Sequence, residues 1–301
     1  MKMLGAMAQE NIGAAELASG KGHNDENFPV ASFLLHPRHR AVILAFYRFA
    51  RAADDVADHA HADAATKLAL LDEMRATIKG ESNAAPDARR LRDALEPLGL
   101  SNVHALDLIE AFSRDVTKLR YASWDELMDY CRYSAMPVGR FVLDVHGETK
   151  SAWPANDALC AGLQIINHLQ DCANDFRSLN RVYVPQDCLA AAGLTVEALD
   201  EPKASLALKG VIRSLAERTG ELISQAKPFA AQIRDTRLAL EVSVIQRLAE
   251  DLRERLIHCD PLSQRVHHRR GETLLLALSS IARFVPSLPQ RFLARSHRRT
   301  A

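Results

Sequence analysis

Apolar residues recur at helical spacing through most of the chain, in segments of about 15 to 25 residues. Few stretches alternate with the period of two that marks a strand, and β-branched residues are sparse. The pattern predicts an all-α protein of roughly ten helices without a sheet. Gly, Pro and short polar clusters predict breaks at residues 80–87, 97–102, 147–156, 178–185, 200–202, 260–261 and 270–271. Helix starts are expected after Ser101, Ser123 and Asn156–Asp157.

The segment from Arg40 to Asp58 reads as an apolar helix that carries a polar stripe. At 100° per residue, four of its polar side chains fall within about 60° of one another and a fifth lies at the edge: Tyr47, Arg51, Asp54, Asp58 and then Asp55. Crowded carboxylates repel unless a cation neutralises them, and such oxygen ligands suit Mg²⁺. Arg51 adds a donor fork suited to phosphate. The alternative is a solvated acidic face on which Arg51 makes an internal salt bridge.

A second stripe lies on the predicted helix from Ala158 to Phe176. Its members occupy an arc of about 80° on a surface otherwise built of Ala, Leu and Ile: Gln164, Asn167, Asp171 and Asp175. The two carboxylates lie one turn apart, as in a pair that shares a metal ion. A polar seam between packed helices is the alternative for this stripe alone. Two acidic stripes in one helical chain favour a central cavity in which carboxylates face each other and hold Mg²⁺ ions that bridge to a diphosphate.

A di-iron site is the rival metal centre in a helical bundle. Such a site uses Glu and a Glu-x-x-His pair, whereas this chain offers Asp, and His168 beside the stripe lacks such a partner. Arg181 and Tyr183 follow the second helix closely enough to close over a bound anion, although an ordinary surface loop with a salt bridge would look the same.

Composition places the chain among ordinary globular proteins. Its 301 residues are 48% apolar and 25% charged, and 38 basic residues balance 38 acidic ones, which gives no support for nucleic-acid binding. Five dispersed Cys without a CxxC pair favour free thiols in a reducing cytoplasm. We expect a loose segment at residues 1–22 and a single helical domain at 23–301, with no secretory signal and no span of the bilayer.

The same residues fall into four motifs in one order: Tyr47-x-x-x-Arg51-x-x-Asp54-Asp55-x-x-Asp58, Tyr130-Cys131-Arg132-Tyr133-Ser134-x-x-Pro137-Val138-Gly139, Gln164-x-x-Asn167-x-x-Gln170-Asp171-x-x-x-Asp175 and Arg181-x-Tyr183-x-Pro185. With these motifs the chain resembles the squalene/phytoene synthase family of trans-isoprenyl-diphosphate synthases over about residues 25 to 260. Each motif alone is weak, but together they are highly specific. The segment from Glu26 to Ser32 and the phrase YCRYSAMPVGR are most similar to the hydroxysqualene-forming branch of the hopanoid pathway.

The resemblance implies an isoprenoid-synthase-type bundle and a Mg²⁺-dependent reaction in which presqualene diphosphate and water give hydroxysqualene and diphosphate. It also implies roles for individual residues. Mg²⁺ would be held by Asp54, Asp55, Asp58, Asp171 and Asp175. The substrate would be bound by Asn27, Phe28, Tyr47, Arg51, Gln164, Asn167, Arg181 and Tyr183. The catalytic set would comprise Tyr130, Tyr133, Arg51, Asp54 and Asp171. Tyr130 is the first choice for a tyrosine near the cation or leaving group, and a core tyrosine with a satisfied hydroxyl is the alternative.

Two rival functions remain at this point. A condensing enzyme that joins two farnesyl diphosphates to squalene or dehydrosqualene would carry the same acidic motifs. A non-catalytic assembly factor on the same fold would lose its carboxylates, whereas all five Asp are present here. For partners we expect a prenyl diphosphate, no nucleic acid, and a peripheral contact with the membrane or with neighbouring pathway enzymes. The expected location is the cytoplasm or the inner face of its membrane. The Arg-rich stretch from Arg283 to Arg299 reads either as an ordinary last helix or as a basic amphipathic element that touches anionic lipid.

Overall fold

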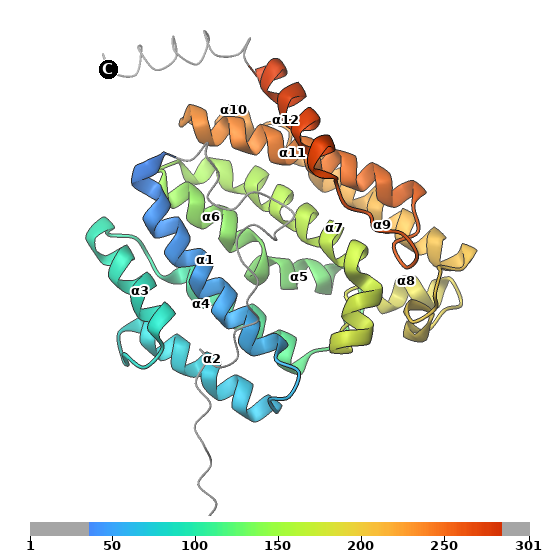
Figure 1. Cartoon of the computed structure of the whole chain (residues 1–301), viewed down its shortest axis with the longest axis horizontal. Coiled ribbons are helices and arrows are strands. Elements are labelled where there is room, and N and C mark those ends of the chain that lie inside the picture. Colours follow the sequence, from blue (N-terminus) through green and yellow to red (C-terminus); the bar gives the residue numbers. More distant parts are fainter. Residues whose placement is uncertain (1–35, 285–301) are drawn as a thin grey trace, which may run out of the picture.

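Twelve α-helices follow one another between residues 36 and 284, the part of the chain that the computed structural model describes (Figure 1). Within that range the only β-type pairing is one isolated parallel bridge between Arg120 and Val182. The all-α prediction is therefore confirmed, and two helices more than expected are present because α8 and α10 are very short. The helices are α1 Pro37–Asp58, α2 Ala64–Lys79, α3 Pro86–Leu95, α4 Val103–Thr117, α5 Trp124–Ser134, α6 Met136–Val145, α7 Trp153–Leu179, α8 Gln186–Ala191, α9 Leu206–Gln225, α10 Phe229–Gln232, α11 Thr236–His258 and α12 Arg270–Phe284.

The two helices with acidic stripes, α1 and α7, lie on different sides of the bundle. α1 packs mainly against α2, α3 and α4, whereas α7 packs mainly against α6, α9 and α11. In Figure 1 the helices α5 and α6 lie between α1 and α7. One apolar core joins all of these elements, because its buried members run from Val42 on α1 to Phe284 on α12. The acidic residues therefore sit on a rigid helical framework.

Helix ends follow the sequence signals in most places. The Ser123 side chain accepts a hydrogen bond from the Glu126 backbone N–H, which confirms the predicted start of α5. The prediction for the start of α7 was wrong. The helix begins at Trp153 with Pro154 in its first turn, so Asn156 lies inside it and is 1% exposed. The expected break at residues 270–271 is also displaced, because α12 already begins at Arg270.

Gly139 in the second motif allows α6 to pack closely against α7. A Cβ atom at this position would lie 2.0 Å from Asn156 Oδ1 and 2.7 Å from Cys160 Sγ. Any side chain here would displace the buried side chain of Asn156 or push the two helices apart. The glycine of the motif therefore serves the contact between α6 and α7.

The bridge between Arg120 and Val182 joins two segments that are far apart in the sequence. The Val182 N–H donates to the Leu119 carbonyl at 2.9 Å, so the segment after α7 runs beside the end of α4. Arg120 adds a hydrogen bond from Nη2 to the Asn180 side chain at 2.6 Å. This pairing brings Arg181 and Tyr183 next to the last turn of α4.

Residues 1–35 and 285–301 lie outside the described range. The predicted boundary at residue 22, the predicted ligands Asn27 and Phe28, and most of the Arg-rich C-terminal stretch fall there and stay predictions. Of the helices in residues 36–284, none combines the length and the apolar character that crossing a bilayer would require.

Candidate active site

Arg181 connects the segment after α7 to the acidic end of α1. Arg181 is 6% exposed, and its guanidinium lies 2.5 Å from Asp58 Oδ1. The same group donates to the backbone carbonyls of Ala57 and Asp115, each at 3.0 Å. Arg181 thus makes a buried ion pair with a predicted metal ligand at the end of α1, and its predicted contact with the diphosphate stays a prediction.

Asp115 on α4 is the centre of a buried polar cluster that the sequence did not reveal. Asp115 is 4% exposed, and its carboxylate accepts hydrogen bonds from two hydroxyls, that of Tyr130 at 2.7 Å and that of Tyr183 at 2.8 Å. Burial raises the pKa of Asp115, while Arg181 and the two hydroxyls favour its charged form. Asp115 therefore orients both tyrosines. The only signal in the sequence was a single acidic residue on the apolar face of an amphipathic helix.

The stripe on α1 is internally paired. Arg51 lies 2.8 Å from Asp54 and 2.6 Å from Asp55, as the salt-bridge alternative anticipated. Asp55 is 7% exposed, so it points more deeply into the protein than its neighbours in the stripe. This position suits a residue that holds Arg51 in place.

Asp54 carries the clearest electrostatic signature in this region. The pKa of Asp54 is raised from 3.8 to about 7, mainly by burial and next by the carboxylate of Asp58, with smaller contributions from Asp115 and Asp55 and an opposing effect of Arg51. Negative charge is therefore in excess here despite the arginine. A bound divalent cation would relieve that excess.

His168 belongs to the α7 stripe, although the sequence placed it only beside the stripe. Its ring stacks on the Tyr183 ring with centroids 3.5 Å apart, and its Nε2 lies 3.0 Å from Gln164 Nε2. Its Nδ1 lies 3.9 Å from Asp175 Oδ2, and its charge acts on the pKa of Asp115. His168 thus joins the second acidic motif to the Asp115 cluster.

Asp171 faces the segment that precedes α12. The side-chain amide of the adjacent Gln170 donates to the Val266 carbonyl. This bond brings His267 near Asp171. Burial lowers the pKa of His267, and the negative charge of Asp171 partly opposes that lowering. The second stripe is therefore bordered by the residues before α12, a contact that the sequence did not predict.

The remaining predicted site residues are two polar residues of the stripes and the two tyrosines of α5. The side chains of Tyr47 and Asn167 are half-buried on α1 and α7. Tyr133, by contrast, packs its ring under the Arg114 guanidinium, 4.1 Å from the ring centroid, whereas Tyr130 points to Asp115. Of the two tyrosines predicted to be catalytic, Tyr130 is the one that the structure joins to the cluster.

The two acidic motifs are connected by one ion pair and by a series of electrostatic interactions through Asp115. The Arg181 ion pair ties the end of α1 to the segment after α7, and Asp115 links Asp54 electrostatically to His168 and thereby to Asp175. In the described part of the chain, no three His, Cys, Asp or Glu residues already lie close enough to form a cation-binding cluster. A direct confrontation of the two sets of carboxylates stays a prediction.

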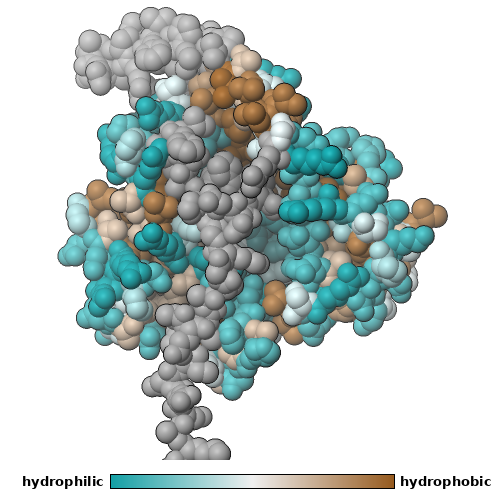
Figure 2. Space-filling model, in the orientation of Figure 1, coloured by the Kyte–Doolittle hydropathy of each residue, from teal (hydrophilic) through white to brown (hydrophobic). Residues whose placement is uncertain are grey.

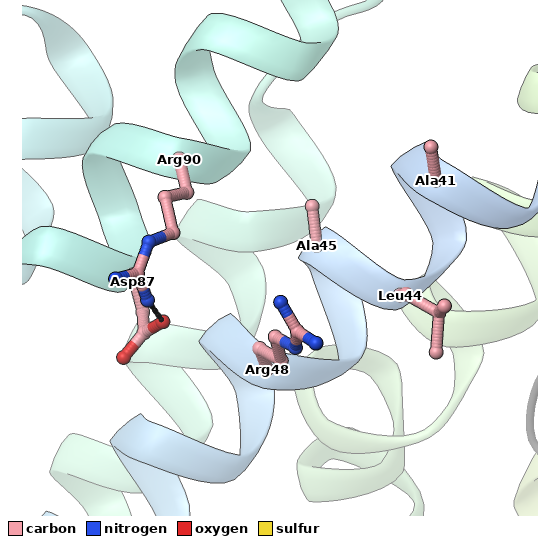
Figure 3. A pocket seen from close by; sticks show the side chains of 6 residues that line it. All are labelled: Ala41, Leu44, Ala45, Arg48, Asp87 and Arg90. Atoms are coloured by element: carbon pink, nitrogen blue, oxygen red, sulfur yellow. Dashed lines mark hydrogen bonds and ion pairs between the residues drawn. The ribbon is translucent and has the colours of Figure 1, made fainter.

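A groove between α1 and α3 lies away from this cluster (Figure 3). Its one carboxylate, Asp87, accepts a hydrogen bond from Arg90 at 2.9 Å, and none of the predicted site residues lines it. The groove is lined by Ala41, Leu44, Ala45, Arg48, Asp87 and Arg90. With a single carboxylate, the groove lacks the clustered carboxylates of the candidate site.

The raised pKa of Asp54 predicts a pH-dependent stability of the metal-free protein. A carboxyl whose pKa is higher in the folded than in the unfolded state costs stability as pH rises from about 4 through about 7. Asp54→Asn removes that loss. In the presence of EDTA, we expect the Tm of the variant to fall less between pH 5 and pH 8 than the Tm of the wild type, measured by differential scanning fluorimetry. Asp72→Asn, which changes a carboxyl that is 72% exposed, is the control. Equal pH dependence of wild type and Asp54→Asn would contradict the assignment.

Comparison with known proteins supports the family resemblance. A family model described as squalene/phytoene synthase matches residues 22–272. The hydroxysqualene synthase of Zymomonas mobilis subsp. mobilis is 55% identical over 276 residues, which cover 91% of this chain and 93% of that protein. The hydroxysqualene synthase of Rhodopseudomonas palustris is 55% identical over 269 residues, covering 89% and 92%.

A solved structure agrees with the fold. The crystal structure of squalene synthase HpnC from Alicyclobacillus acidocaldarius is 31% identical and superposes with a TM-score of 0.67, covering 79% of this chain and 89% of that one. The all-α isoprenoid-synthase-type bundle predicted from the motifs is therefore confirmed.

Proposed function

This chain belongs to the squalene/phytoene synthase family, and on that premise we propose that it converts presqualene diphosphate and water to hydroxysqualene and diphosphate with Mg²⁺. The chain is a prenyl-diphosphate-processing enzyme of this family. The observation that carries the choice of reaction is its identity of 51–55% to three hydroxysqualene synthases over most of its length. The tyrosine rings held by Asp115 fit any reaction of this family that passes through a carbocation.

The carboxylates of the two acidic stripes are ligands of the kind that Mg²⁺ binds. Carboxylates are the ligands this hard cation prefers, and the raised pKa of Asp54 reports an excess of negative charge that a cation would neutralise. The residues that would hold it are Asp54, Asp58, Asp171 and Asp175, with Asp55 supporting through Arg51. When bound, Mg²⁺ would act as a Lewis acid that stabilises the departing diphosphate.

The protein's own residues would prepare the substrate for ionisation. The guanidinium groups of Arg51 and Arg181 would attract the diphosphate, and their existing ion pairs with carboxylates hold them at the site beforehand. As the C–O bond breaks, the bonding electron pair leaves with the diphosphate. The cyclopropylcarbinyl cation rearranges, water adds its oxygen, and loss of one proton completes hydroxysqualene.

The aromatic side chains near Asp115 would face the developing cation. The rings of Tyr130 and Tyr183 lie 5.5 Å apart, and Tyr121 stacks on Tyr183 at 5.5 Å. Aromatic faces stabilise positive charge without offering a nucleophile. Because both hydroxyls donate to Asp115, these rings are held in one orientation. Phe46 and Phe141 stack on each other at 3.9 Å within the core, which agrees with a packing role for both.

Product analysis separates the proposed reaction from head-to-head condensation. We expect the purified protein with Mg²⁺ to turn over presqualene diphosphate and, in ¹⁸O-labelled water, to place one labelled oxygen in the product detected by mass spectrometry. Farnesyl diphosphate alone should give no product. Formation of squalene or dehydrosqualene from farnesyl diphosphate, or an unlabelled hydrocarbon from presqualene diphosphate, would overturn the proposal.

A further inference from the structure

Three large apolar side chains are exposed together on α12. Leu274 is 60% exposed, Leu275 is 68% exposed and Leu278 is 52% exposed. The other strongly exposed apolar residues in the described range are single residues on separate elements: Leu98, Val103, Val138 and Leu206. Single exposed leucines are common, whereas a group on one helix face marks an interaction surface. Figure 2 shows a hydrophobic patch in the region where Figure 1 places α12.

The exposed face of α12 is apolar along its length. At 100° per residue, five of the six exposed positions of α12 fall within an arc of about 100°, and the sixth, Arg283, lies about 80° beyond its edge. The five are Gly271, Leu274, Leu275, Leu278 and Ala282. The opposite face is fastened to the protein, because Ser280 is 3% exposed and its hydroxyl lies 2.9 Å from that of Ser243 on α11. The leucines therefore point outward from a helix whose other side is anchored.

Positive charge borders this face at both ends. Arg265 and Arg269 are exposed before the first turn of α12, and Arg283 is exposed in its last turn. The one acidic residue of α12, Glu272, is already bound by Arg255 at 3.1 Å. From residue 273 to residue 301 the sequence contains five Arg and no Asp or Glu, although the whole chain has a formal charge of zero. Exposed leucines bordered by arginines complement an anionic lipid surface, in which the leucines enter the acyl boundary and the arginines contact phosphates.

We propose that the exposed leucine face of α12 docks this protein on the surface of anionic membranes. The face has the apolar content that a lipid boundary needs, and its charge pattern selects negatively charged headgroups. The docking surface is separate from the Asp115 cluster, so this proposal does not depend on the reaction proposed above.

Vesicle flotation tests the docking surface. The probes are vesicles of phosphatidylcholine alone and of phosphatidylcholine with about one-third phosphatidylglycerol. We expect the full chain to float with the anionic vesicles, at least about tenfold more than with the neutral ones, and to be released by high salt. The triple variant Leu274→Gln/Leu275→Gln/Leu278→Gln should lose at least about tenfold in anionic-vesicle binding. Leu206→Gln, which changes a leucine that is 90% exposed on α9, is the matched control and should bind like the wild type.

The contrary outcomes identify other occupants of the face. A wild type that does not float with anionic vesicles, or a triple variant that floats equally well, overturns the proposal. If the non-floating wild type is a dimer by analytical ultracentrifugation and the triple variant a monomer, the face is an interface between two copies. If the non-floating wild type is instead a monomer, and the triple variant has a Tm several degrees below that of the wild type, another part of the chain covers the leucines. None of these measurements involves catalysis, so their failure is distinguishable from failure of the proposed reaction.

Discussion

Asp171→Asn is expected to lower kcat/KM for presqualene diphosphate by at least about 10³-fold while leaving the fold intact, because charge stabilisation of the leaving group is the largest contribution to such a reaction. The substitution keeps the size of the side chain and removes only its charge. Asp54→Asn should have an effect of the same order. Steady-state turnover with saturating Mg²⁺ measures both, and circular dichroism checks the fold.

The double variant gives a sharper test of whether the two stripes act together. If Asp54 and Asp171 serve one diphosphate, the double variant should be little worse than either single variant, because residues that act as a unit are not additive. Asp72→Asn on α2 is the control and should retain wild-type turnover, since this carboxyl is exposed at the surface. Retained activity in both single variants, or effects that multiply, would contradict a shared site.

Arg181→Met is expected to destabilise the protein by about 3 kcal/mol, because it leaves Asp58 and two backbone carbonyls without their donor. This loss of stability is at the lower end of the range for breaking a buried ion pair, because the Asp58 side chain is 35% exposed. For a chain of this size, the loss corresponds to a fall in Tm of at least about 5 °C. Thermal unfolding followed by circular dichroism gives the measurement.

A matched arginine separates the effect of burial from the effect of bonding. Arg177 also contacts one carboxylate and two carbonyls, those of Asp200 and Glu201, but its side chain is 42% exposed. Arg177→Met should therefore cost less than about 1 kcal/mol. Equal losses for the two variants would show that Arg181 is not the buried connection between α1 and the segment after α7.

The helices and their polar stripes could be predicted from the sequence because both rest on local periodicity. The stripes on α1 and α7 are spaced at helical intervals, and the cap at Ser123 is a short-range signal. The start of α7 was misplaced because Asn156 looks like a cap, whereas it is a buried contact between α6 and α7. A local signal cannot distinguish these two uses of an asparagine.

The connections between elements could not be predicted in the same way. Asp115 has no pattern around it, and its importance arises only when the bridge between Arg120 and Val182 brings Tyr183 beside α4. The family motif placed Tyr130 and Tyr133 together, but side chains three residues apart on one helix can meet different partners, and these two do. His168 was set aside because it lacked a Glu partner for iron, whereas its partners here are Gln164, Tyr183 and Asp175.

The central claim is that the aspartates of α1 and α7 hold one diphosphate between them through divalent cations. A crystal structure of the protein with inorganic diphosphate and Mn²⁺ in place of Mg²⁺ tests it most directly, because Mn²⁺ is located by its anomalous scattering. We predict metal peaks at the diphosphate, with ligands from Asp54 or Asp58 on one side and from Asp171 or Asp175 on the other. Peaks bound to one helix alone, or to carboxylates at the outer surface, would contradict the account.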